Sequence, residues 1–191
     1  MIHFKNQILE SIKLKESLFL LKNDVNKAIN LVSNTLKKKN KIFICGNGGS
    51  AADAQHLSAE FLVRLRPHVN RKPYPVISLA MDTSTITACA NDYDFKYLFS
   101  RNLEALAKKG DLLICITTSG NSKNIIEVLK MAKKLKLKTL SFLGKGGGQA
   151  KKYSKNNIIV DSKNTARIQE MHIFLGHFIF ESVENSLISR K

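Results

Sequence analysis

The fold is decided by residues 41–60, KIFICGNGGSAADAQHLSAE. A short apolar run over 42–45 predicts a buried strand. The glycine-rich run 46–49 (Gly-Asn-Gly-Gly) follows at once, and backbone without side chains can turn sharply there and approach a ligand. Ser50 is the expected N-cap of the next helix, with Asp53 in the first turn, where a carboxylate complements the helix dipole. A strand, a glycine-rich turn and a helix N-terminus together predict an anion-binding site.

Length and composition favour one soluble domain. At 191 residues the chain can bury a sizeable core. No apolar run approaches the ~20 residues needed to cross a bilayer. The charged N-terminal segment lacks the apolar stretch of a signal peptide, so a cytoplasmic location is expected. The three cysteines, Cys45, Cys89 and Cys115, have neither metal-ligand nor redox spacing and are interpreted as reduced structural thiols.

The formal net charge of +16 could attract nucleic acid, an anionic membrane or anionic metabolites. The lysines are spread along the chain, however, and several fall at the ends of predicted helices, where cations complement the dipole. No arginine-rich patch is interleaved with aromatic residues. A solvated, lysine-rich surface is therefore the simpler interpretation, and neither nucleic acid nor a membrane is expected as a partner.

The remaining pattern predicts an α/β fold. Residues 1–39 carry apolar positions at helical spacing and predict two helices, or one bent helix, with a break or a cap at Asn23-Asp24. The apolar face of such an arm is expected to pack against another subunit. The expected strands are 42–45, 76–79, 112–116, 138–143 and 157–160, and the expected helices are 51–64, 83–90, 95–107, 125–135 and 165–187, with a turn at 91–94. This alternation predicts a three-layer, doubly wound fold with a mostly parallel five-stranded sheet.

A second anion site is predicted after the strand 112–116. Residues 117–122, Thr-Thr-Ser-Gly-Asn-Ser, place four hydroxyl groups and a glycine between a strand and a helix. Hydroxyls and backbone N–H groups at a helix N-terminus form a natural cradle for phosphate. The alternative is that Asn121 or Ser122 merely caps the helix. Both glycine-containing turns follow strands, and ligands of such sheets bind at the carboxyl ends of the strands.

His56 and Glu60 lie four residues apart and so share one helix face. This spacing suits metal ligation, acid–base catalysis or an ordinary ion pair. The final helix holds four more candidates: Gln169, Glu170, His172 and His177. Spacing alone pairs Gln169 with His172, whereas His177 lies about 12 Å from Gln169 along the axis. His177 is surrounded by apolar residues, where a histidine is more often part of the core.

Four motifs in this order resemble the sugar isomerase (SIS) family: GNGGSAADAQHLSAE, CANDY, TTSGNS and RIQEMHIFLGH. The resemblance covers nearly the whole chain and implies one SIS domain over 1–191, with the helical arm 1–39 packing in a homotetramer. It implies an aldose–ketose isomerase that converts sedoheptulose 7-phosphate to D-glycero-D-manno-heptose 7-phosphate through an enediolate. Such an activity would supply heptose for bacterial lipopolysaccharide or capsule.

The resemblance also implies a role for each matching residue. Glu60 and His177 match the proposed acid–base pair. The implied substrate contacts are Asn47, Gly48, Gly49, Glu60, Asn91, Asp92, Thr117, Thr118, Ser119, Ser122 and Gln169. One zinc ion per subunit would be held by His56, Glu60, Gln169 and His177. The resemblance thus favours His177 over His172, against the spacing argument. Ala166 stands where members often carry Asp, and Thr117 keeps the hydroxyl of the commoner Ser.

Two other functions stay open at this point. One is a non-catalytic SIS protein that binds the bacterial replication initiator, which would suit the basic charge. The joint presence of Glu60, Gln169 and His177 disfavours it, because a binding protein has no chemical need for that set. The other is an isomerase of a different sugar phosphate, which the sequence distinguishes poorly.

Overall fold

The computed structural model describes residues 2–80 and 82–188 and contains one five-stranded, all-parallel sheet. The strand order is β2-β1-β3-β4-β5. The strands are β1 (Ile42–Gly46), β2 (Val76–Ser78), β3 (Leu112–Thr117), β4 (Lys138–Leu143) and β5 (Asn156–Ile159). The doubly wound α/β fold is confirmed, and each strand lies within about one residue of its predicted ends, the usual uncertainty of such boundaries.

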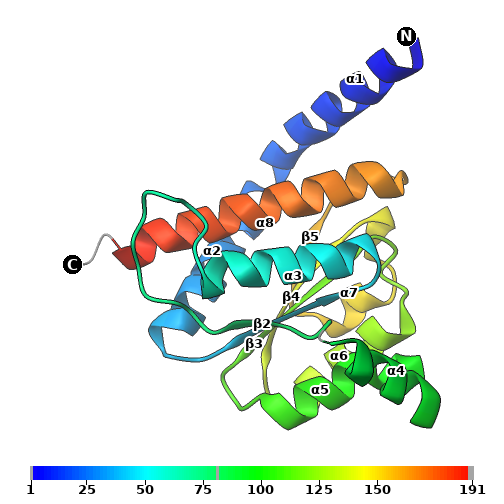
Figure 1. The fold of residues 1–191 in the computed structure, drawn as a ribbon. Coiled ribbons are helices and arrows are strands. Elements are labelled where there is room, and N and C mark those ends of the chain that lie inside the picture. Colours follow the sequence, from blue (N-terminus) through cyan, green and yellow to red (C-terminus); the bar gives the residue numbers. More distant parts are fainter. Residues whose placement is uncertain (1, 81, 189–191) are drawn as a thin grey trace.

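Helices cover both faces of the sheet (Figure 1). They are α1 (Ile2–Ser17), α2 (Lys22–Lys37), α3 (Gly49–Leu62), α4 (Thr83–Asp92), α5 (Leu98–Leu106), α6 (Lys123–Lys134), α7 (Ala150–Tyr153) and α8 (Thr165–Ile188). Three short 3₁₀ turns complete the elements: η1 (Leu18–Leu21), η2 (Phe95–Tyr97) and η3 (Lys145–Gly147). Among the described helices, none combines the length and apolarity that a membrane span requires.

The central strands separate two hydrophobic cores. Ile42 and Ile44 of β1 join the core formed with α2, α3 and α8. Phe43 and Cys45 point to the opposite face and join the core formed with α5 and α6. This alternation follows from the pleat of a strand, and burial on both faces explains why β1 reads as a continuous apolar run.

The N-terminal arm consists of two helices, but the break comes earlier than predicted. The 3₁₀ turn η1 joins α1 to α2, and Asn23-Asp24 already belongs to α2. Asp24 lies in the first turn of α2, where its carboxylate complements the dipole, so the polar pair marks a helix start rather than a gap. In Figure 1, α1 projects away from the body of the protein.

Two local predictions about helix starts are wrong. Gly48, rather than Ser50, is the N-cap of α3, with φ 55° and ψ −124°. Glycine adopts this conformation without strain, so the helix begins at Gly49 and Ser50 is buried inside it. The first turn of α3 holds no acidic residue, so Asp53 lies beyond it.

The region after β2 also differs in detail. The turn predicted at 91–94 begins later, because α4 continues through Asp92. The helix predicted over 95–107 starts as η2, which is capped by the Asp94 carboxylate, and continues as α5. The side chain of Asp94 accepts from Lys96 N, which makes this residue a helix cap rather than part of an open turn.

Candidate active site

The carboxyl ends of β1 and β3 form the switch point of the sheet. β1 is paired with β2 on one side and with β3 on the other. Gly46 is aligned with Ile116, so the turn after β1 and the loop after β3 start side by side. Crevices at such points are the usual ligand sites of doubly wound sheets.

A pair of side-chain amides ties the two turns together. Asn47 Nδ2 donates to Asn124 Oδ1 at 2.9 Å, and Asn124 Nδ2 donates to Asn47 Oδ1 at 2.7 Å. Asn124 is buried in the first turn of α6. Asn124 was not predicted from the sequence, because only its partner lies in a recognisable motif. The amide of Asn47, a predicted sugar contact, is engaged in this pair.

The loop 117–122 is shaped by its own hydroxyl groups. Thr117 Oγ1 accepts from Gly120 N at 3.2 Å, and Ser119 Oγ accepts from Asn121 N at 3.1 Å. Ser122 occupies the N-cap position of α6, but its side chain makes no cap hydrogen bond. The Ser122 hydroxyl is therefore not used for capping, which favours the anion-binding interpretation over the capping alternative.

The glycine-rich turn after β4 packs against the loop 117–122. Ala150 N donates to Gly120 O at 2.8 Å, and Gln149 N donates to Asn121 Oδ1 at 3.0 Å. A methyl group on Gly120 would lie 2.1 Å from Gly147 O, so the two backbones touch. Contacts this close hold the loop in one shape before any ligand arrives.

Three side chains from α3 and α8 converge beside these turns. His56 Nε2 lies 2.8 Å from His177 Nε2 and 3.3 Å from Glu60 Oε1. One ligand atom from each residue lies within 4.8 Å of the others. His177 is only half-buried, so it is not a core residue, and its role in the site stays a prediction.

The approach of α8 to α3 depends on Gly176. A methyl group at this position would lie 2.7 Å from Leu57 Cδ1. Leu57 follows His56 in sequence and Gly176 precedes His177, so this contact sets the distance between the two histidines. Gly176 was not predicted from the sequence, because a glycine within a helix does not reveal which neighbour it accommodates.

The spacing argument that pairs Gln169 with His172 is wrong. His172 is fully buried, and its Nε2 donates to Leu143 O at 3.1 Å. Burial lowers the pKa of His172 to about 4, so this ring is a neutral core group. Gln169 instead lies against the glycine turn, since a methyl group on Gly49 would be 2.6 Å from Gln169 Nε2. The crossing of α8 over the sheet turns position 172 toward β4, which spacing along one helix cannot reveal.

Burial and charge act on the neighbouring titratable groups. Burial lowers the pKa of His177, and nearby His56 lowers it further, while Glu60 opposes the change. Burial raises the pKa of Asp53, against the opposing charge of His56. Among the described residues, the buried Oδ2 of Asp53 has no hydrogen-bond partner. Asp53 therefore lies near the histidine–carboxylate group and does not act at the start of α3.

The group formed by His56, Glu60 and His177 can hold a metal ion. Two imidazole nitrogens and a carboxylate are suitable donors, and ligands of a tetrahedral site with 2.0–2.2 Å bonds lie about 3.3 Å apart. The 3.3 Å separation of His56 and Glu60 matches that value, the 2.8 Å separation of the two histidines is shorter, and all three donor atoms lie within 4.8 Å of one another. The donor set therefore fits a divalent cation, and equally suits proton transfer.

Other predicted residues remain predictions. Asn91 and Asp92 are exposed at the end of α4, and Asn91 Nδ2 donates to Asp92 Oδ1 at 2.8 Å. Ala166 lies in the first turn of α8, with its backbone N donating to Asn164 Oδ1 at 3.1 Å. The methyl group of Ala166 offers no polar contact to a ligand.

These features define an α/β protein with a hydroxyl-rich loop at the switch point of its sheet and a histidine–carboxylate group formed between α3 and α8. The SIS domain family matches residues 4–144, and the chain belongs to this family. It is 52% identical over 159 residues to a phosphoheptose isomerase of Campylobacter concisus, covering 83% of each chain. It is 43% identical over 190 residues to the phosphoheptose isomerase of Clostridium acetobutylicum, covering 97% of this chain and 95% of the relative.

Solved structures of phosphoheptose isomerases are also similar to this chain. The phosphoheptose isomerase of Neisseria gonorrhoeae superimposes with a TM-score of 0.89 at 36% identity, over 96% of this chain and 97% of that one. The enzyme of Francisella tularensis superimposes with a TM-score of 0.91 at 31% identity, with the same coverage. Both similarities extend through the N-terminal arm, because they cover nearly the full length of each chain.

Proposed function

We propose that the chain is a phosphoheptose isomerase, an aldose–ketose isomerase that converts sedoheptulose 7-phosphate to D-glycero-D-manno-heptose 7-phosphate through an enediolate. The observation that carries this proposal is the convergence of Glu60 and His177, 117 positions apart in the numbering, in one group with His56. The relatives with this name, at 41–52% identity, support the substrate class.

The phosphate would bind to the loop 117–122. The hydroxyls of Thr118 and Ser122, the backbone N–H groups of the loop and the N-terminus of α6 offer donors to an anion. Thr117 and Ser119 shape the turn through their internal hydrogen bonds. We assign the turn residues Asn47, Gly48 and Gly49, together with Asn91, Asp92 and Gln169, to the sugar hydroxyls. Phosphate binding would supply binding energy far from the reacting carbons.

Glu60 would act as the base that moves a proton between C1 and C2. It takes a proton from C1 of the ketose, which leaves an enediolate, and returns the proton to C2. His177 would carry the oxygen-bound proton from the C1 hydroxyl to the oxygen at C2, so that the aldehyde forms at C1. Since Glu60 Oε1 faces His56 at 3.3 Å, we assign the proton transfer to Oε2.

We propose one zinc ion per subunit, held by His56, Glu60, His177 and the amide oxygen of Gln169. When bound, zinc supplies a positive charge that polarises the carbonyl and stabilises the enediolate oxygen. The positions of the three titratable ligands support this assignment, because their donor atoms lie within 4.8 Å of one another. Gln169 would complete the set from α8, where its side chain lies against the glycine turn.

We also propose a homotetramer in which the arm 1–39 of one SIS domain packs against neighbouring subunits. Several large apolar side chains of the arm are exposed: Ile2, Phe4, Ile8, Leu9, Ile12, Phe19 and Leu20. An apolar groove of about 700 Å³ runs between this arm and α8, lined by Ile12, Phe19, Phe174 and Phe178, among others. Exposed apolar surface of this kind is typical of subunit interfaces.

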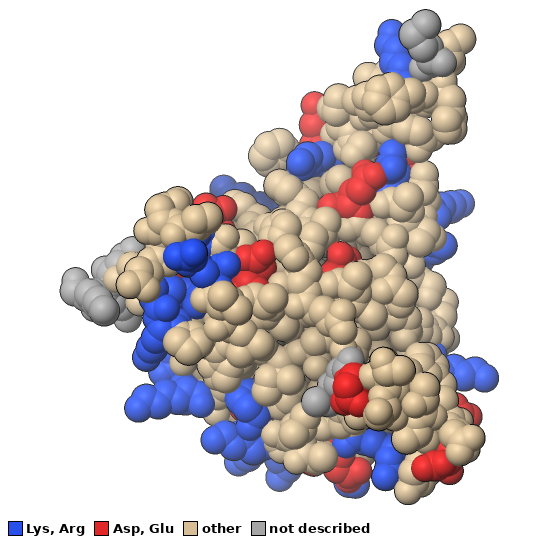
Figure 2. Space-filling view, in the orientation of Figure 1, with Lys and Arg blue, Asp and Glu red and all other residues tan. Residues whose placement is uncertain are grey.

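A cytoplasmic role in supplying heptose for a bacterial surface glycan follows from this activity. On the face shown in Figure 2, Lys and Arg side chains lie mainly around the rim and are interspersed with acidic ones. This distribution supports the solvated-surface interpretation over a nucleic-acid interface. The replication-initiator alternative is not favoured, because the named relatives are isomerases.

The test is an assay of the purified protein against a panel of phosphoketoses, with product identified by NMR. We expect turnover of sedoheptulose 7-phosphate in preference to pentulose and hexulose phosphates. Elemental analysis of protein purified without added metal is expected to find about one zinc per chain, and His56→Ala is expected to lose it. Turnover of another ketose alone would replace the substrate assignment, and metal-free protein insensitive to chelators would remove zinc from the proposal.

A further inference from the structure

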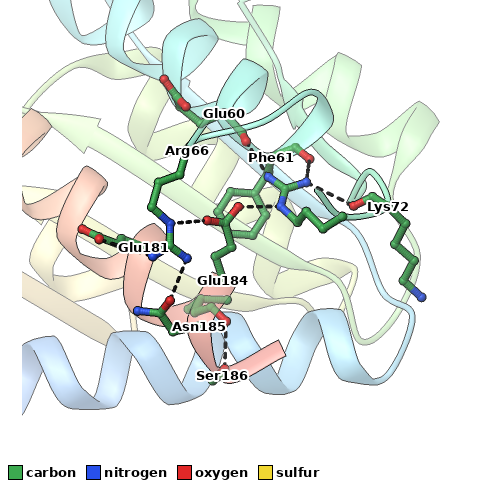
Figure 3. A network of polar contacts seen from close by, with 10 residues as sticks. Glu60, Phe61, Arg66, Lys72, Glu181, Glu184, Asn185 and Ser186 are labelled. Carbon is green, nitrogen blue, oxygen red and sulfur yellow. Dashed lines mark hydrogen bonds and ion pairs between the residues drawn. The ribbon is translucent and has the colours of Figure 1, made fainter. Parts of the chain in front are cut away.

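A buried ion-pair network lies directly behind Glu60 (Figure 3). Its centre is Glu184 of α8, whose side chain is fully buried. Arg71 Nε donates to Glu184 Oε1 at 2.6 Å, and Arg66 Nε donates to Glu184 Oε2 at 2.8 Å. Both arginines come from the segment between α3 and β2. Buried charges need such partners, so the three side chains stabilise one another.

Arg71 also binds the backbone of α3. Its Nη2 donates to Glu60 O at 2.6 Å, and its Nη1 donates to Phe61 O at 2.9 Å. The last carbonyl groups of a helix have no intrahelical partner. Because α3 ends at Leu62, the Arg71 guanidinium caps its final turn, with only 3% of the Arg71 side chain exposed.

The capped turn is the one that carries the Glu60 carboxylate. In Figure 3 the backbone carbonyl of Glu60 is directed to the network, whereas its carboxylate points away from it. The carboxylate lies 3.3 Å from His56 on the preceding turn. Fraying of the last turn would therefore move the carboxylate relative to His56 and His177, while the anion-binding loop after β3 stayed in place.

We propose that Arg71, held by Glu184, is a positioning residue that fixes the Glu60 carboxylate for proton transfer. This inference rests on the proposed isomerase function. The hydrogen bonds of the Arg71 side chain go to the end of α3, to Lys72 O and to Glu184, so its direct contact with Glu60 is through the end of α3. Its planar fork is required, because a single ammonium group cannot reach Glu184 and two carbonyl oxygens together.

Arg66 is a matched control within the same network. Its polar partners are Glu181, Glu184 and Asn185, all of them on α8. Loss of Arg66 would weaken the ion pairs without removing the cap of α3. A purely structural network would make the Arg66 and Arg71 variants equivalent in activity once stability is matched.

The experiment compares Arg71→Lys and Arg71→Gln with Arg66→Lys and Arg66→Gln in the full chain. We expect the Arg71 variants to lose about 10- to 100-fold in kcat, because small misplacements of a catalytic group have effects of this size. KM for the ketose phosphate should stay within about threefold, since the phosphate contacts are untouched. The Arg66 variants should keep kcat within about threefold of wild type.

Hydrogen exchange provides a readout that does not depend on turnover. In Arg71→Lys, amides 60–63 should lose protection while the rest of α3 keeps it. In Arg66→Lys, amides 60–63 and the rest of α3 should all stay protected. Unchanged protection and kcat in Arg71→Lys would overturn the proposal, as would equal losses of kcat in Arg66→Lys. If Arg71→Gln does not fold, Arg71→Lys and Glu184→Gln decide the outcome.

The two proposals fail in distinguishable ways. Wild-type protein that turns over no phosphoketose would refute the isomerase function, and with it the catalytic role of Arg71. The exchange pattern would then still decide whether Arg71 caps α3. Active wild-type protein with normal Arg71 variants would refute the positioning role alone.

Discussion

The loop after β3 and the group between α3 and α8 are built in different ways. Residues 117–122 are contiguous, and their hydroxyls bond to backbone within the same loop. His56 and His177 lie 121 positions apart and meet only where two helices cross. The difference indicates that binding of the phosphate depends on local structure, whereas the chemistry depends on helix packing. Variants in the two regions should therefore fail differently.

Removal of the base should have the largest effect. Glu60→Gln keeps the size of the side chain but cannot accept the C1 proton, so kcat should fall by about 10²- to 10⁴-fold. KM should change little, because the phosphate loop is intact. Steady-state kinetics on sedoheptulose 7-phosphate, with circular dichroism to verify the fold, measures both. Wild-type kcat in this variant would remove Glu60 from the mechanism.

A change in the phosphate loop should affect KM instead. Ser122→Ala removes a hydroxyl that α6 does not use as a cap, so the helix should keep its stability. A hydrogen bond to a charged group contributes about 1.5–3 kcal/mol, which corresponds to a rise in KM of roughly 10- to 150-fold. Ser182→Ala on α8 provides a surface control. If kcat fell while KM stayed constant, the two regions would not be separable as proposed.

Gly176→Ala tests the packing between the two helices. Alanine in an open helix position is more stable than glycine by about 0.8–1 kcal/mol. Here the methyl group would lie 2.7 Å from Leu57 Cδ1, so overpacking should instead destabilise the fold by about 1–3 kcal/mol. The free energy of unfolding, measured with denaturant, and kcat should both fall. Adding Leu57→Ala to the same chain should restore part of kcat. A stabilised, fully active Gly176→Ala protein would contradict this role for the glycine.

A last effect, on stability rather than on turnover, is expected from the protonation of His172. Its pKa is about 4 in the folded protein, against 6.5 for an unperturbed histidine. Between these values the unfolded chain binds the extra proton, so stability is lost as pH falls from 6.5 to 4, by up to about 1.4 kcal/mol per pH unit. In His172→Gln, the free energy of unfolding measured with urea should lack this part of its dependence on pH. If the stability of wild type and His172→Gln depended equally on pH, His172 would not be a buried core group.

Much of the site follows from motifs, but its geometry does not. The order of strands and helices and the two turns at the sheet edge are legible in short segments, because burial on both faces leaves continuous apolar runs and turns need glycine or hydroxyl residues. Asn124, Gly176 and Arg71 gave no such signal. Asn124 and Gly176 act through partners far away in the chain, respectively Asn47 and Leu57, and Arg71 is held by Glu184, 113 positions away.

By itself, the sequence determined the parallel sheet, the glycine turn and the hydroxyl loop, because these depend on the chemistry of neighbouring residues. Its resemblance to the SIS family also selected His177, for which spacing along the helix favoured His172. Only the tertiary structure decided which histidine faces α3 and which faces the core, because the crossing of α8 over α3 and β4 sets the direction of each side chain. At that crossing Gly176 leaves room for Leu57, since a methyl group there would lie 2.7 Å from Leu57 Cδ1.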